Sequence, residues 1–115
     1  MQFQLPYPPS VNTYWRKWRN RIVLSAKGRA YREAVWLAVR GAGILVPMTG
    51  PLRVEVEACA PDRRRRDLDN LWKALLDALA HAGAYADDSQ IVDERIYWGP
   101  MVKGGRVVVD VDEVG

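Results

Sequence analysis

Residues 52–60 alternate between two kinds of side chain in one uninterrupted run. The even positions are apolar (Leu52, Val54, Val56, Ala58 and Ala60), and the odd positions carry Arg53, Glu55, Glu57 and Cys59. Because successive side chains of a strand point to opposite faces, this period of two predicts a strand with one buried and one wetter face. Helices elsewhere in the chain must then cover the buried face.

Two helices are predicted to provide that cover. The first spans residues 26–39, with Ser25 as its N-cap and Gly41 and Gly43 at its end. The second spans residues 68–82, from Asp67 at its cap to Gly83 just past its end.

Further strands are predicted at residues 2–7, 90–98 and 106–114, with a short extended piece at 21–24. The turn-forming pairs Gly99-Pro100 and Gly104-Gly105 suggest that the last two strands form a hairpin. Residues 8–18, 44–50 and 61–66 are predicted to be loops. The order of elements predicts an α/β (α+β) two-layer fold, a mixed, partly antiparallel sheet with two helices packed on one face.

Length and composition limit the class of protein. The 115 residues correspond to one domain, residues 1–115, and a chain with 49% apolar and 27% charged residues is expected to be globular. The single cysteine, Cys59, and the single histidine, His81, exclude an intramolecular disulfide, a Cys-rich zinc site and a His-rich metal cage. The chain shows neither a membrane-spanning run nor a signal segment, so we expect a cytoplasmic protein without membrane contact.

Charge is divided unevenly along the chain. Residues 1–66 carry 13 Lys/Arg and 4 Asp/Glu, a net of +9, whereas residues 67–115 carry 4 Lys/Arg and 10 Asp/Glu, a net of −6. A basic half is typical of a protein that binds a polyanion. Acidic residues beside it are explained if a cation is bound between carboxylates and phosphate, although two solvated faces would give the same asymmetry.

The most informative stretch is the arginine run 63–66 and the predicted helix that follows it. On that helix Asp69, Lys73 and Asp77 share one polar stripe, which is expected to face outward. The opposite side is apolar and forms the expected core face, with Leu71, Leu75, Ala78, Leu79 and Ala82.

Asp67, Asp69 and Asp88 form a candidate metal site if the start of the strand at 90–98 approaches the start of the helix. Such a group of oxygen ligands suits Mg²⁺ or Mn²⁺, and Lys73 would neutralise charge at the reacting phosphate. Each feature also has an ordinary explanation. Asp67 is a normal N-cap, Asp69 and Lys73 are spaced as a helical ion pair, and Asp87-Asp88-Ser89 is a common turn.

The segments 65–70, 77–79 and 87–90, with Lys73 and Gly83, resemble the RusA family of Holliday junction resolvases. The segments 8–16 and 25–32 also resemble that family, so the likeness covers nearly the whole chain. The resemblance implies a homodimeric, Mg²⁺- or Mn²⁺-dependent endodeoxyribonuclease that resolves four-way DNA junctions by paired symmetric nicks in recombination and repair.

Carried over by position, the resemblance assigns catalysis to Asp67, Asp69, Lys73 and Asp88, and metal binding to the three carboxylates. The residues expected to contact DNA are Asn12, Trp15, Arg16, Lys27, Arg63, Arg64, Arg65, Arg66 and Asn70. Aromatic rings among cations at residues 14–19 suit unstacked bases, or else pack in the core or a dimer interface.

Two other functions remain open from the residues alone. One is a non-catalytic DNA-binding or regulatory module of phage origin, in which the acids only cap and solvate. The other is a metal-dependent phosphohydrolase that acts on nucleotides. The arginine run and the basic half of the chain argue against it, because they favour a polymeric substrate over a mononucleotide.

Overall fold

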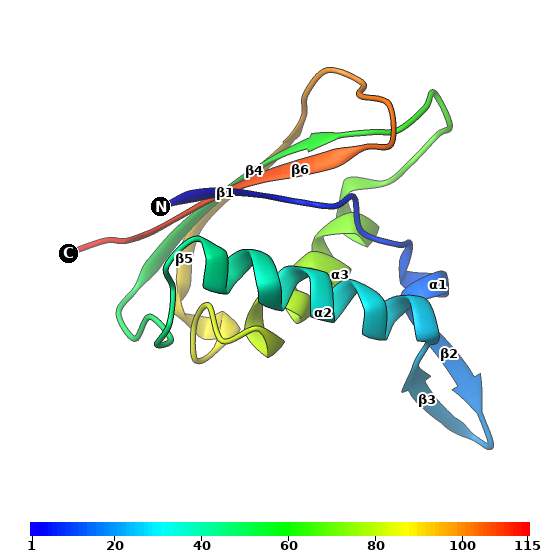
Figure 1. Ribbon diagram of the computed structural model, residues 1–115, viewed down its shortest axis with the longest axis horizontal. Coiled ribbons are helices and arrows are strands. Elements are labelled where there is room, and N and C mark those ends of the chain that lie inside the picture. Colours follow the sequence, from blue (N-terminus) through cyan, green and yellow to red (C-terminus); the bar gives the residue numbers. More distant parts are fainter.

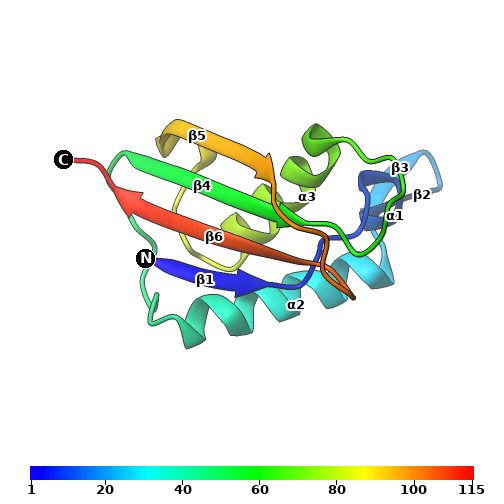
Figure 2. The ribbon, with the colours of Figure 1, turned by 90° about the horizontal axis from the view of Figure 1, so that it is seen from above.

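Four strands form one sheet in the computed structural model, which describes residues 1–115 (Figure 1). Their order across the sheet is β1 (Gln2–Leu5), β6 (Arg106–Glu113), β4 (Leu52–Cys59) and β5 (Ile91–Trp98). Figure 2 shows β4 running parallel to β5 and antiparallel to β6, with β1 at the far edge. The predicted mixed, partly antiparallel sheet is confirmed.

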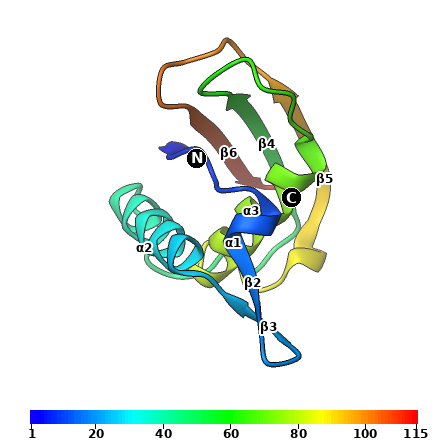
Figure 3. The same ribbon diagram turned by 90° about the vertical axis from the view of Figure 1, so that its right-hand side faces the viewer.

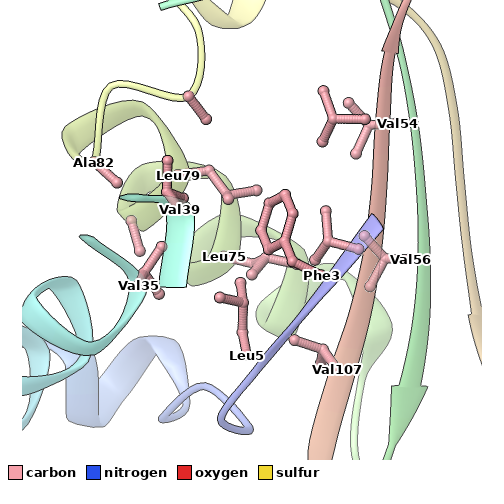
Figure 4. Packing of buried hydrophobic residues seen from close by; sticks show 14 of the residues in the cluster. Phe3, Leu5, Val35, Val39, Val54, Val56, Leu75, Leu79, Ala82 and Val107 are labelled. Carbon is pink, nitrogen blue, oxygen red and sulfur yellow. The ribbon is translucent and has the colours of Figure 1, made fainter. Parts of the chain in front are cut away.

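The helices α2 (Ala26–Gly41) and α3 (Leu68–His81) cover the same face of this sheet (Figure 3). The even-numbered residues of β4 from 52 to 58 and the odd-numbered valines of β6 are all buried between the two layers. Figure 4 shows Val54, Val56 and Val107 facing Leu75 and Leu79 of α3, with Phe3 and Leu5 of β1 beside them. The two-layer prediction with both helices on one face is therefore confirmed.

The helix boundaries follow the predicted signals. The Ser25 hydroxyl accepts a hydrogen bond from the Gly28 backbone N–H at 2.9 Å, and Asp67 caps α3 in the same manner. Just beyond the helix ends, Gly43 and Gly83 adopt positive φ angles of 91° and 78°, which glycine tolerates without a steric penalty.

The predicted hairpin of β5 and β6 is wrong, because β4 lies between these two strands. The connection 99–105 passes the end of β4, where the Gly99 and Val102 backbone N–H groups donate to the carbonyls of Ala58 and Ala60. β4 and β6 are the two inner strands of the sheet. The apolar side chains that β4 turns inward, from 52 to 58, are completely buried, which suits an inner strand.

The predicted loop 8–18 is only partly correct. It contains the short helix α1 (Val11–Tyr14) and the strand β2 (Trp15–Trp18), which forms a hairpin with β3 (Arg21–Leu24). The turn at Arg19 and Asn20 has φ angles of 46° and 58° and lacks the glycine that normally marks such a turn. Figure 1 shows the hairpin extending away from the sheet and the two long helices.

None of the helices in the structure has the length and apolar character needed to cross a membrane. Cys59 is buried at the end of β4. Trp36 and Trp98 are exposed rather than buried in the core, and Trp72 is half-buried and donates to Glu94 Oε2 at 3.0 Å, which connects α3 to β5.

Candidate active site and nucleic-acid interface

The candidate site is built around the first turn of α3. The chain leaves β4 at Cys59, crosses the arginine run and enters α3 after Asp67. One carboxylate oxygen of Asp67 accepts the Asp69 backbone N–H at 2.9 Å, so the two acidic residues are held beside each other at the helix N-terminus. The ordinary role of Asp67 as an N-cap is confirmed, and its second oxygen is not needed for that role.

A cleft of about 970 Å³ opens at this helix end. One wall is the segment 64–71 and the other is the N-terminal segment that begins at Tyr7. The lining residues are Tyr7, Pro8, Pro9, Ser10, Thr13, Lys27, Arg64, Arg65, Arg66, Asp67, Leu68, Asn70, Leu71 and Trp98. The structure thus brings two segments that are far apart in sequence to one cleft, and Asp67 belongs to one of its walls.

Arg66 organises the loop that precedes α3. Its Nη1 donates to Asp62 Oδ1 at 2.7 Å, and its guanidinium lies 5.6 Å from the centre of the Tyr7 ring. The hydrogen bond from Arg66, with a second from the Arg64 backbone N–H, lowers the pKa of Asp62 to about 2. These contacts connect Arg66 back to the start of the loop, while Arg63, Arg64 and Arg65 are exposed toward solvent.

Basic charge dominates the rim of the cleft. Lys27 at the start of α2 and Arg65 beside Asp67 are both exposed and belong to no ion pair of the structure. Free cations next to a helix N-terminus form a strongly anion-attracting surface, since the exposed N–H groups of the first turn add partial positive charge.

Asp69 and Lys73 are exposed on α3 one turn apart, and no ion pair forms between them. Their spacing is therefore not explained as a helix-stabilising pair. Both charges remain available to a ligand beside the cleft.

The prediction that the polar stripe of α3 faces outward along its whole length is wrong at Asp77. The Asp77 carboxylate accepts hydrogen bonds from Arg32 of α2 and from the buried Tyr14 hydroxyl. α1 lies across this part of α3, so the carboxylate is half-buried and joins three helices.

Asp88 lies in a different place from Asp67 and Asp69. It opens a single 3₁₀ turn, η1 (Asp88–Gln90), which Asp87 caps through a bond from the Ser89 backbone N–H. Tyr85 positions this turn, because its hydroxyl donates to the Leu76 carbonyl in the middle of α3. Burial, followed by the nearby Asp88 charge, raises the pKa of Tyr85.

Within one chain the three candidate carboxylates do not meet. Leu76 lies nine residues beyond Asp67, about 14 Å along the helix axis at 1.5 Å per residue. The sheet gives the reason: β5 pairs in parallel with β4 and starts opposite Leu52, whereas α3 starts after the far end of β4. No three His, Cys, Asp or Glu side chains of the chain come close enough to hold a metal ion.

Comparison with known proteins identifies the family. The model of the family described as "Endodeoxyribonuclease RusA" matches residues 6–112. The chain belongs to the RusA family. Membership makes this chain a nuclease that acts on DNA, and every candidate site residue lies inside the matched range.

Individual RusA proteins are similar over almost their full length. "Crossover junction endodeoxyribonuclease RusA" proteins of Escherichia coli (strain K12) and Enterobacteria phage 82 are each 46% identical over 111 residues, which is 96% of this chain and 92% of the relative. The relative from Enterobacteria phage HK97 is 46% identical over 113 residues, 98% of this chain and 94% of the relative.

The candidate DNA-binding residues of this RusA chain fall into two groups. Lys27, Asn70 and the arginines 64–66 line the cleft, whereas Arg63, Asn12, Trp15 and Arg16 lie outside its lining. Trp15 is half-buried and packs edge-to-face on Tyr14, with ring centres 5.0 Å apart.

Sequence reasoning did not identify Tyr7, Ser10, Thr13 and Trp98 as parts of the cleft. The Pro8-Pro9-Ser10 segment was a detectable signal, because it resembles the family, but its position opposite the arginine run depends on the fold. Trp98 gave no signal at all, since it reaches the cleft only through the parallel pairing of β5 with β4.

Proposed function

We propose that the protein is a metal-dependent, structure-selective endodeoxyribonuclease that resolves four-way Holliday junctions by paired symmetric nicks, in recombination and repair. The observation that carries the proposal is the cleft that gathers Lys27 and three arginines around Asp67 at the N-terminus of α3. The junction substrate is supported by the names of relatives that are 46% identical over 96% of the chain. Such a substrate places the enzyme in the cytoplasm, with the DNA.

The residues present fit a hydrated Mg²⁺, with Mn²⁺ as a substitute. Mg²⁺ in enzymes that act on phosphates keeps several waters and takes one or two carboxylates plus phosphate oxygens. Asp67 and Asp69 supply carboxylates of this kind on the same helix turn, and the cap uses only one Asp67 oxygen. When bound, the cation would polarise the phosphodiester and activate a water for attack.

The protein side chains would hold the DNA backbone and balance its charge. Lys27 and Arg65 at the rim of the cleft would each bind a phosphate, and Asn70 would donate to the strand that lies across the cleft. Lys73, one turn beyond Asp69 and free of any ion pair, would neutralise negative charge that develops on the phosphorus during cleavage.

We infer a homodimer from the same site. Asp88 lies beside the middle of α3, away from Asp67 and Asp69, so a third carboxylate must come from elsewhere if the site is to have three. Asp88 of the partner subunit would complete the pair on a two-fold dimer. The substrate has approximate two-fold symmetry as well, so two equivalent sites would cut matching strands.

Mapped cleavage of a synthetic junction tests the enzyme. Each strand is labelled at its 5′ end and incubated with the protein in Mg²⁺ or in EDTA. We expect paired nicks at symmetry-related positions in Mg²⁺ only, no cleavage by Asp69→Asn, and normal cleavage by Asp93→Asn. Asp93 is a matched control because it is an exposed aspartate of β5 whose side chain forms no ion pair. Junction binding without cleavage in any divalent metal would instead support a non-catalytic module.

Mixing two inactive variants tests the shared site. A dimer of one Asp69→Asn and one Asp88→Asn subunit would contain one doubly altered site and one intact site. We expect the mixture to nick one strand, although each variant alone is inactive. If every site lay within a single chain, the mixture would stay inactive.

A further inference from the structure

The β2–β3 hairpin has a composition and a placement unlike the rest of the fold. Residues 15–22 contain four cations (Arg16, Lys17, Arg19 and Arg21) and no acid. Every residue from 16 to 22 is exposed, and Figures 1 and 3 show the hairpin extending clear of the sheet. It extends from the region where α1 meets α2, and Thr13 and Lys27 on either side of it line the cleft.

The base of the hairpin is firmly anchored. The Ser25 hydroxyl oxygen lies 2.5 and 2.9 Å from the carbonyl oxygens of Thr13 and Tyr14, which share its one hydrogen, and the Ser25 backbone N–H donates to the Tyr14 carbonyl at 3.0 Å. A Cβ added at Gly28 would lie 2.4 Å from the Tyr14 carbonyl oxygen, so the start of α2 is packed directly against this base. A two-stranded hairpin alone is marginally stable, and here the anchored base supplies the stability.

Each face of the hairpin carries one exposed apolar side chain next to a cation. Paired residues of an antiparallel ladder share a face, which places Trp18 with Arg21 on one face and Ile22 with Lys17 on the other. Trp18 is 40% exposed and Ile22 is 75% exposed. Both faces of the hairpin therefore offer an apolar side chain and a positive charge to DNA.

The turn of the hairpin holds a cation where glycine would be easier to accommodate. Arg19 has a φ angle of 46°, in the left-handed region that disfavours a side chain. Strained residues of this kind concentrate at functional sites. The arginine places a positive charge at the most distant point of the hairpin, with its guanidinium 4.6 Å from the centre of the Trp18 ring.

We propose that the β2–β3 hairpin enters the branch point of the DNA junction and stacks Trp18 on an exposed base pair, and thereby sets the preference for branched over duplex DNA. This inference rests on the proposed junction substrate. Base pairs next to a branch point can separate and expose their flat faces, which are covered within a duplex. Aromatic stacking on such faces is favourable for any base, and the surrounding cations bind the converging phosphates.

Binding measurements in EDTA separate this role from cleavage. Polarisation with a labelled four-way junction and with a duplex of the same arm sequence gives the two dissociation constants. We expect Trp18→Ala to weaken junction binding at least tenfold, as loss of one stacked base predicts, and to change duplex binding less than twofold.

Trp36→Ala is the matched control. Trp36 is 43% exposed and has the Arg40 guanidinium 5.0 Å from its ring, as Trp18 has Arg19, but it lies on α2. We expect its loss to leave both dissociation constants unchanged. Equal weakening by the two variants would overturn the proposal.

Arg19→Gly guards against misfolding as the explanation. Glycine relieves the positive φ angle, so the melting temperature should stay the same or rise while junction affinity falls several-fold. If Trp18→Ala and Arg19→Gly retain junction preference, the hairpin proposal fails although the junction substrate stands. If the two variants weaken binding to the junction and to the duplex by the same factor, the hairpin holds DNA of any shape and the proposed role in junction preference fails. If the wild-type protein shows no junction preference, both proposals fail.

Discussion

Arg32 of α2 and Asp77 of α3 form a two-pronged ion pair, with Nε 2.9 Å from Oδ2 and Nη2 3.1 Å from Oδ1. The buried Tyr14 hydroxyl donates to the same carboxylate, and burial, together with that bond, raises the pKa of the Tyr14 phenol. The side chains of Arg32 and Asp77 are only 21% and 28% exposed. Asp77 therefore fixes α1 and α2 against α3 and does not face the cleft.

Asp77→Ala should destabilise the protein by about 2 kcal/mol, because it leaves Arg32 and Tyr14 without their charged partner. Urea denaturation measures the free energy of unfolding. Asp93→Ala, on the exposed surface of β5, should change it by less than about 0.5 kcal/mol. A double-mutant cycle with Arg32→Ala should give a coupling energy of about 1 kcal/mol or more. A value near zero would contradict a stabilising role of the Arg32–Asp77 ion pair.

Two substitutions at Asp67 should separate its capping role from its chemical role. Asparagine is as good an N-cap as aspartate, so Asp67→Asn should keep the stability within about 0.5 kcal/mol, whereas Asp67→Ala should cost about 1 kcal/mol. Both should abolish junction cleavage, since both remove the carboxylate. Unfolding and cleavage are measured on the same preparations. Cleavage retained by Asp67→Asn would show that only the cap matters.

Lys73→Ala should reduce the cleavage rate at least a hundredfold while changing junction affinity less than threefold. A charge that acts mainly in the transition state contributes to the rate and little to binding. Single-turnover cleavage with saturating protein gives the rate, and polarisation gives the affinity. A parallel fall in both quantities would make Lys73 a simple phosphate anchor.

Arg65→Ala should lower the salt dependence of DNA binding. Each phosphate contact contributes about one unit to the slope of log affinity against log salt concentration, so the slope should fall by about 1. Arg53→Ala is the control, because Arg53 is exposed on β4 and outside the cleft. Identical slopes for the wild type and Arg65→Ala would exclude a phosphate contact at this position.

Acid should release the loop that leads into α3. The pKa of Asp62 is lowered from about 3.8 to about 2 by its hydrogen bonds from Arg66 and from the Arg64 backbone. A lowered pKa means that the ionised carboxylate stabilises the folded loop above about pH 4, and that this contribution disappears as the pH falls through about 2. NMR titration of the Asp62 carboxyl carbon measures the pKa. Arg66→Ala should raise it toward 3.8, and an unchanged pKa would contradict the contact.

The sequence predicts the fold well where the signals are local. The alternation of β4 and the apolar side of α3 each depend on neighbouring residues only, and both are confirmed. The position of β6 is different: Gly104-Gly105 is compatible with a tight hairpin and with a connection that passes another strand. The β2 strand was missed because its turn uses Arg19 and Asn20 instead of glycine.

The candidate site was predictable only where its residues are neighbours in the sequence. Asp67, Asp69 and the arginine run lie within one strand-to-helix connection, so their proximity follows from local structure. The place of Asp88 depends on whether β5 runs parallel to β4, and the involvement of Asp77 depends on α1 crossing α3. Neither long-range arrangement leaves a periodic signal in the sequence.

Gln90 uses its whole side-chain amide at the turn that carries Asp88. Its oxygen accepts the backbone N–H groups of Ala86 and Asp87, both at 2.8 Å, and its nitrogen donates to the carbonyls of Met48 and Gly50, both at 2.9 Å. Glutamate lacks the two donors, and asparagine is one methylene too short to reach both sides. Tolerance to substitution at this half-exposed position is therefore set by the number of hydrogen bonds that the side chain can donate and accept. Every replacement would loosen the turn that carries Asp88, although no charged residue of the site is itself substituted.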